Sequence, residues 1–332
     1  LDVRRRGPLV VVDKGHLLFA GAEIDVNAQL PGFPSPDDGR MRLSIVGPDL
    51  ARLRSVLQLP GRAAGAYSMA FELDVNADGI EIAKLDVESE LLEVKGSATL
   101  GPAPRHIGTA LELEVSAASL AELGSAYGVE NLPDRAVAID GAATLLAEGI
   151  RTRGPVDVRS GKLVGSVDGL ITLRPDFADS DLTVNLQGPD LALVLRIFGV
   201  HGVGEAPFDI ALDVRRRGPL VVVDKGHLLF AGAEIEVNAQ LPGFPSPDDG
   251  RMRLSIVGPD LARLRSVLKL PGRAAGAYSM AFELDLNADG IAIAKLDVES
   301  ELREFKGSAT IGPAPRHIGT AHKLEVSATS HA

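Results

Sequence analysis

The sequence predicts a mainly β protein, in which repeated antiparallel β-sheet units of about 70 residues, with one short helix each, form an elongated curved β-groove. Three observations predict this class. A phrase that begins Gly-Pro-Asp-Leu recurs at a fixed interval, and the residues before each copy alternate between apolar and polar side chains. In addition, 45% of the 332 residues are hydrophobic but only 4% are aromatic, so the apolar surface consists mainly of aliphatic side chains.

A long internal repeat sets the domain organisation. Residues 1–121 align with residues 212–332 at a constant offset of 211, and 110 of the 121 aligned positions are identical. The phrase begins at positions 47, 188 and 258, and degenerate copies begin at 117 and 328. We therefore expect the end of a first repeat unit at 1–46, four units at 47–116, 117–187, 188–257 and 258–327, and the start of a truncated unit at 328–332.

The residues before each phrase predict strands with one apolar face. Leu43 and Ile45 stand four and two positions before Gly47, and Ser44 between them is polar. The same pattern precedes the other copies of the phrase. Side chains of a strand alternate between its two faces, so this period of two predicts an antiparallel sheet with one wetted face. Similar segments elsewhere in each unit predict about four or five strands per unit.

The phrase itself predicts the short helix. Pro48 fits the first helical turn, where its missing N–H costs nothing, and Asp49 fits a cap or first-turn position. Leu50, Leu53 and Leu57 follow at helical spacing, and a Pro-Gly pair ends the run. We expect a helix of about eight to ten residues in each unit, whose leucines pack on the sheet or close the end of the groove.

Composition and motifs argue against several function classes. The net charge of −11 argues against a nucleic-acid partner. Because cysteine is absent, the chain has no disulfide, thiolate metal site or cysteine nucleophile. It contains no run of 18 apolar residues and no P-loop, dinucleotide-binding or serine-hydrolase motif. We expect a protein that is not an enzyme and that uses no cofactor.

One stretch resembles a metal site but is better explained as a turn. Asp74–Gly79 matches the first half of an EF-hand loop, but Leu85 stands at the twelfth position, where a bidentate Glu belongs. A hairpin turn between two strands explains this stretch and its copy at 285–290. The seven histidines show no metal-ligand spacing, so we expect no metal.

The apolar strand faces are the candidate functional surface. One interpretation is a closed core, in which two sheets pack face to face. The other is a single curved sheet whose apolar faces line a trough suited to a chain-like ligand such as an acyl chain. For this trough we predict a lining that includes Leu43, Ile45, Met69, Phe71, Leu73, Leu113, Val115, Val184, Leu186, Phe208, Ile210, Leu254, Ile256, Phe282, Leu324 and Val326.

The order of these features resembles that of a known family. Gly-Pro-Asp-Leu-Ala-Arg-Leu at 47–53 is followed by a Leu-rich segment that ends in Leu-Pro, by the strand Ala66–Val75 and by the Gly-containing strand Lys95–Leu100. This arrangement, repeated over essentially the whole chain, resembles bacterial AsmA-like proteins of the AsmA, TamB and YhdP types.

The resemblance implies a function, which the spacing of the repeated phrase and strands does not imply by itself. Proteins of this family look like bridge-type lipid carriers of Gram-negative bacteria, with a β-groove that crosses the periplasm. By this resemblance we expect a phospholipid-conducting segment in the periplasm, with acyl chains as ligands and with inner-membrane attachment through a segment absent from this chain. The alternatives are an assembly scaffold for outer-membrane proteins that pairs client β-strands, and a closed β-solenoid that serves as a spacer.

Overall fold

The computed structural model divides into two compact parts, an N-terminal half, Leu1–Gly161, and a C-terminal half, Lys162–Ala332. The residues that the structure describes are 2–7, 9–32, 38–57, 64–76, 79–102, 105–126, 132–174, 177–197, 203–243, 249–269, 275–287, 290–300, 304–311 and 321–327.

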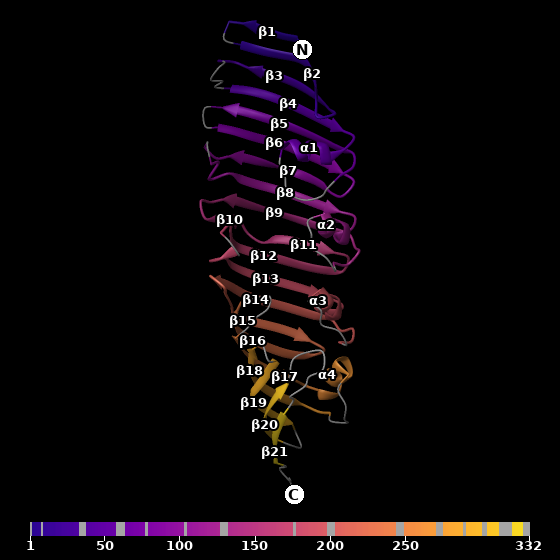
Figure 1. Ribbon diagram of the computed structural model, residues 1–332, viewed down its shortest axis with the longest axis vertical. Helices are drawn as coiled ribbons and strands as arrows, with labels where there is room; N and C mark the ends of the chain where they lie inside the picture. Colours follow the sequence, from indigo (N-terminus) through magenta and orange to yellow (C-terminus); the bar gives the residue numbers. More distant parts are fainter. Residues whose placement is uncertain are drawn as a thin grey trace. The chain divides into compact units, whose positions relative to one another are not determined.

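Strands make up most of both halves (Figure 1). The N-terminal half contains β1 (Asp2–Arg6), β2 (Leu9–Phe19), β3 (Ala22–Leu30), β4 (Asp38–Gly47), α1 (Leu50–Leu57), β5 (Tyr67–Asn76), β6 (Gly79–Ser89), β7 (Glu93–Leu100), β8 (Ala110–Ala117), α2 (Leu120–Ala126), β9 (Val137–Leu145), β10 (Gly149–Thr152) and β11 (Val156–Ser160). The C-terminal half contains β12 (Leu163–Thr172), β13 (Asp181–Gly188), α3 (Leu191–Ile197), β14 (Phe208–Arg217), β15 (Leu220–Phe230), β16 (Ala233–Pro242), β17 (Asp249–Gly258), α4 (Leu261–Leu268), β18 (Tyr278–Asn287), β19 (Gly290–Ser300), β20 (Glu304–Ile311) and β21 (Ala321–Ser327).

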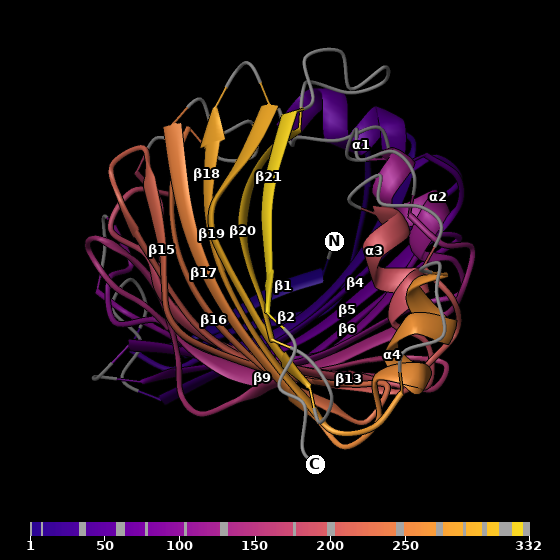
Figure 2. The same cartoon turned by 90° about the horizontal axis from the view of Figure 1, so that it is seen from below.

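Each half is an antiparallel meander. Every strand from β1 to β9 pairs with the next one along the chain, and the short strands β10 and β11 both pair with β9. The strands from β12 to β21 pair in the same sequential way. Figure 2 shows the strands of each half as a bent single layer. The predicted class, antiparallel and mainly β on a curved sheet, is confirmed.

The helices recur with the predicted period. They begin at Leu50, Leu120, Leu191 and Leu261, which are 70 or 71 residues apart, and four or five strands separate one helix from the next. Helices α1 and α4 have eight residues, the lower limit of the expected eight to ten, and α2 and α3 have seven.

The start of each helix differs from the prediction in one respect. Helix α1 begins at Leu50, so Pro48 precedes the helix instead of lying in its first turn, and that expectation was wrong. The reason is that Asp49 is the cap, because its carboxylate accepts a hydrogen bond from the N–H of Ala51 at 2.9 Å. Asp190 and Asp260 accept the equivalent bond in α3 and α4, also at 2.9 Å.

A β-bulge explains a change of phase in the alternating pattern of β6. Ile80 and Ile82 stand at even positions, whereas Leu85 and Val87 stand at odd ones. In the structure Ile82 lies opposite Ala98 and Leu85 lies opposite Gly96, so two residues of β6 face one residue of β7. Such an insertion shifts the alternation by one residue, and both pairs of side chains therefore lie on the same face. The same shift occurs in β2, β15 and β19.

Candidate functional site

One face of the N-terminal sheet carries apolar side chains in rows that run across the strands. Ile45, for example, lies directly opposite Ile24 on β3 and Met69 on β5. This first row contains Leu17, Ile24, Ile45, Met69, Val87, Val94, Val115 and Ile139. Because every member is apolar, the row forms an uninterrupted hydrophobic path from β2 to β9.

Two further rows widen this path. The second contains Val26, Leu43, Phe71, Leu85, Gly96 and Leu113, and the third contains Ala28, Met41, Leu73, Ile82, Ala98 and Leu111. The gap at Gly96 is filled from the next strand, because a Cβ atom there would lie 2.8 Å from Cδ2 of Leu113. We call the surface formed by these rows, and by their equivalents in the C-terminal half, the apolar face.

The C-terminal half repeats the arrangement. Its first row contains the positions Leu186, Ile210, Leu228, Ile235, Ile256, Met280, Val298, Phe305 and Val326. Its second row contains Val184, Leu212, Gly226, Val237, Leu254, Phe282, Leu296, Gly307 and Leu324. The described side chains of this half therefore also form an apolar path, from β13 to β19.

Of the sixteen residues predicted to line the groove, fifteen stand at the row positions given above, and for two of them, Leu324 and Val326, only the backbone register is described. The sixteenth, Phe208, lies opposite Gly188 and Phe230 at the end of the strands where the helices lie. Sequence reasoning missed the rest of each row, including Ile24, Val87 and Val94. The alternation of apolar and polar residues in β2, β3, β6 and β7 indicates these positions. In β2 and β6, however, the alternation shifts by one residue at the bulge, so the position of the bulge must be known to assign both parts of the strand to one face.

Most row side chains are half-buried, although Leu17 is exposed and Ala28 and Ala98 are buried. Leu43, Ile45 and Phe71 fall between the buried and exposed classes, whereas Arg42 and Ser44 on the opposite face are exposed. A second sheet packed against the rows would bury them. Within each half, the described strands form one layer, so the rows face a space that no other strand of that half fills.

The larger buried apolar side chains gather where a helix covers one end of the apolar face. In the N-terminal half, Ala22, Leu53 and Tyr67 form a cluster with the partly buried Ile45 and Met69. Helix α1 is held there by a hydrogen bond of 2.7 Å from the N–H of Leu50 to the carbonyl of Gly65. Helices α2, α3 and α4 make the same bond to the segment that leads into the next strand. The prediction that the helix leucines pack on the sheet is thus confirmed for Leu53.

The glycine of the phrase has a packing role. Gly47 lies opposite Tyr67, and a Cβ atom on Gly47 would lie 2.5 Å from Cε1 and Cζ of that ring. Gly258 stands in the same relation to Tyr278. In the degenerate copy the pair is Ala117 and Val137, so a larger residue on one strand accompanies a smaller one on the other.

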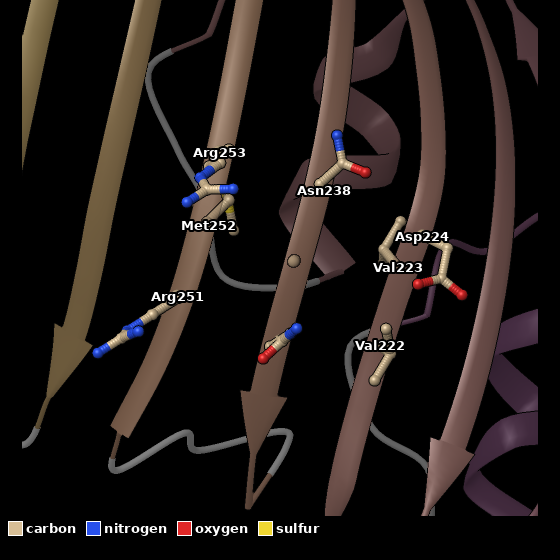
Figure 3. Close-up of a pocket in the computed structure, with 9 residues that line it drawn as sticks. Val222, Val223, Asp224, Asn238, Arg251, Met252 and Arg253 are labelled. Carbon is tan, nitrogen blue, oxygen red and sulfur yellow. The ribbon is translucent and has the colours of Figure 1, made fainter.

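The opposite, polar face of each sheet is charged and exposed. Arg40 pairs with Asp74 and Arg42 with Glu72, each at 3.5 Å. A surface hollow of about 470 Å³ lies on this face of the C-terminal half (Figure 3), beside Asp224 on β15, Asn238 on β16 and Arg253 on β17. Asp224 and Arg253 are already ion-paired, with Arg215 and Glu283. Exposed pairs of this kind contribute about 0–1 kcal/mol each and hold no free charge for a ligand.

Three carboxylates on the polar face come close to one another. Those of Asp86, Glu88 and Glu93 offer oxygen atoms within 4.8 Å, but Lys84 pairs with Asp86 and Lys95 with Glu93. The lysine ammonium groups therefore already balance much of this negative charge.

The predicted turn at Asp74–Gly79 is described only in part. Asn76 and Gly79 face each other at the end of the β5–β6 hairpin, as the hairpin interpretation requires, while residues 77 and 78 lie outside the described residues. Across the described part of the chain, no helix is long and apolar enough to cross a membrane.

The chain matches no family model, no curated protein and no solved structure. The resemblance to AsmA-like proteins therefore rests on the sequence pattern alone.

Proposed function

We propose that this protein is a non-enzymatic, lipid-conducting segment of a bridge-like phospholipid transporter in the periplasm, and that acyl chains lie along the rows of the apolar face. The observation that carries the proposal is the first row of each half, in which consecutive strands each place an apolar residue opposite the next. The resemblance to AsmA-like proteins supports the assignment to the periplasm and to outer-membrane biogenesis.

The dimensions of a row suit a long apolar chain. Neighbouring strands lie about 4.8 Å apart, so the eight strands crossed by the first row of the N-terminal half span about 34 Å. Burial of a methylene group contributes about 0.8 kcal/mol, and a chain that lies on an open face buries roughly half of its surface. A segment of ten methylene groups would then gain about 4 kcal/mol, which favours binding and still permits movement along the row.

The chemistry of the rows favours broad lipid selectivity. Their described members are apolar, and the nearest charged residues, such as Arg42 and Glu72, belong to the opposite face and pair with each other. A headgroup therefore finds no dedicated partner on the rows, and recognition depends on the acyl chain. Half-buried row side chains favour this open arrangement over a closed spacer, in which they would be buried.

Binding of an acyl-chain-labelled phospholipid to the purified chain tests the proposal. Ile45→Asp and Leu113→Asp place a charge on the first and second rows, and we expect each to weaken binding at least tenfold. Ser44→Asp is the matched control, because Ser44 is the exposed neighbour of Ile45 on the other face, and it should change binding less than twofold. Far-UV circular dichroism checks that each variant keeps its strands.

Two results would contradict the proposal. One is an absence of lipid binding by the parent chain together with slow hydrogen exchange over all strands, as a closed spacer predicts. The other is an equal loss of binding in Ile45→Asp and Ser44→Asp, because a lipid on the rows cannot be equally sensitive to both faces.

A further inference from the structure

Strand β14 places an arginine on the same face as the apolar rows. Val214 lies opposite Val223 and so continues the third row in this half. Two positions further along β14, Arg216 lies opposite Val221, which in turn lies opposite Leu241. Side chains two positions apart on a strand share a face. Arg216 therefore stands on the row side of the sheet, at the strand end away from the helices (Figure 1).

The strip of this face that continues from Arg216 across the strands is apolar. Its next members are Val221 and Leu241. Leu241 and Leu286 then flank Gly250, because a Cβ atom on Gly250 would lie 3.2 Å from Cδ2 of Leu241 and 3.4 Å from Cβ of Leu286. An arginine beside such a surface can lay its aliphatic stem on the apolar residues and keep its charged end at the border with water. Arg216 therefore adds a positive charge to the rim of the apolar face.

The guanidinium group of Arg216 is held in place but is not neutralised. Its Nε donates a hydrogen bond of 3.2 Å to the carbonyl of Gly218, and the side chain is half-buried. Asp179, whose N–H binds the carbonyl of Arg216, uses its own carboxylate to pair with Arg174. No carboxylate of the described residues forms an ion pair with Arg216, so its two terminal nitrogen atoms can donate to an anion.

The first copy of the long repeat contains the same arrangement. Arg5, which corresponds to Arg216 at the offset of 211, lies opposite Val10. Its Nε donates a hydrogen bond of 3.1 Å to the carbonyl of Gly7. Gly7 and Gly218 both have positive φ, at 62° and 57°, which glycine adopts without strain. The hairpin itself therefore orients the arginine in each copy.

We infer that Arg216, and Arg5 in the other copy, bind the phosphate group of a lipid whose acyl chains lie on the apolar face. Positions 214 and 216 are about 7 Å apart along the strand, so a chain on the third row brings its phosphate within reach of the guanidinium group. Arginine donates charge-assisted and often bidentate hydrogen bonds to phosphate oxygens. All phospholipids share this phosphate, so the contact anchors a lipid without selecting its headgroup. The inference rests on the proposed function and names a headgroup contact at the rim of the same surface.

Binding of phosphatidylglycerol and of diacylglycerol with the same labelled acyl chains to the intact protein tests the inference. Arg5→Gln combined with Arg216→Gln should weaken phosphatidylglycerol binding about tenfold, because a charge-assisted hydrogen bond is lost. Diacylglycerol has no phosphate, so its affinity should stay the same in this variant. The matched control is Arg4→Gln combined with Arg215→Gln, which removes the same charge from the opposite face and should leave the affinity for both lipids unchanged.

Each other outcome has a distinct meaning. An equal loss of affinity for both lipids in the Arg5 and Arg216 variant would show a packing role and overturn the inference. Unchanged phosphatidylglycerol binding in that variant would overturn it and leave the lipid proposal standing. Binding of neither lipid by the parent chain would overturn the lipid proposal, and the inference with it. Inorganic phosphate at the same concentration as the lipid should not displace phosphatidylglycerol; displacement would show a site for free phosphate and overturn the headgroup assignment.

Discussion

The glycine that begins each phrase and the aromatic residue opposite it should behave as one packing unit. We consider Gly47→Ala. The new methyl group would lie 2.5 Å from the Tyr67 ring, which is 5% exposed and held between the sheet and α1. Carbon atoms pack at about 3.5–4.0 Å, so the ring or the strand must move by about 1 Å. Overpacking of this kind costs about 1–3 kcal/mol.

The degenerate copy suggests the compensating change. Tyr67→Val alone removes most of a buried ring and should cost about 2–4 kcal/mol. The double variant recreates the Ala117 and Val137 pair, so its cost should be lower than the sum of the two single costs by about 1–2 kcal/mol. Native-state hydrogen exchange of β4 and β5 measures each cost locally, and the unchanged Gly258 and Tyr278 pair in the other half is the internal reference.

A graded comparison sharpens this prediction. Gly188→Ala should cost less than Gly47→Ala, because its methyl group would lie 3.0 Å from the Phe208 ring, which can yield by a few tenths of an ångström. Additive costs in the double variant, or equal costs at Gly47 and Gly188, would show that the ring does not fill the space above the glycine and would refute the reasoning.

Two further predictions concern the helix cap and pH. Asp260→Ala should lower the stability of α4, measured by hydrogen exchange, by about 1 kcal/mol. Asp260→Ser should lower it by less, because a serine, Ser119, caps α2 with a hydrogen bond of 3.1 Å. Equal losses of stability in the two variants would contradict the cap assignment. Burial, and secondarily Asp49, raises the pKa of Tyr67, and burial with Asp260 does the same for Tyr278, so the folded state holds these protons more tightly than the unfolded state. Their contribution to stability is therefore complete below about pH 10 and is lost as the pH rises through the folded pKa. Between about pH 9 and 11, the free energy of unfolding in urea should fall less for Tyr67→Phe than for the parent chain. The same dependence on pH in both chains would contradict this account.

Local patterns in the sequence predicted the elements, and features between elements limited the rest. The period of the Gly-Pro-Asp-Leu phrase located the helices, because capping and helical spacing are local properties. The alternation at Leu43 and Ile45 identified the apolar face for the same reason. The continuation of a row through Val87 and Val94 depends on a bulge and on cross-strand register, and these are set by the neighbouring strand.

The pairing of Gly47 with Tyr67 shows the same limit. Twenty positions separate these residues in the chain, and only the register of β4 and β5 brings them together. The start of α1 at Leu50 also depends on a distant residue, because the carbonyl of Gly65 accepts the hydrogen bond of the Leu50 N–H, while the local cap Asp49 binds only that of Ala51.

Photocrosslinking with a phospholipid that carries a diazirine in its acyl chain tests the central claim most directly. After irradiation and proteolysis, mass spectrometry identifies the labelled residues. If acyl chains lie on the apolar face, the label should concentrate at row positions such as Ile45, Leu113 and Ile256 and should spare Ser44 and Arg253. Label spread equally over both faces, or confined to the polar face, would contradict the claim.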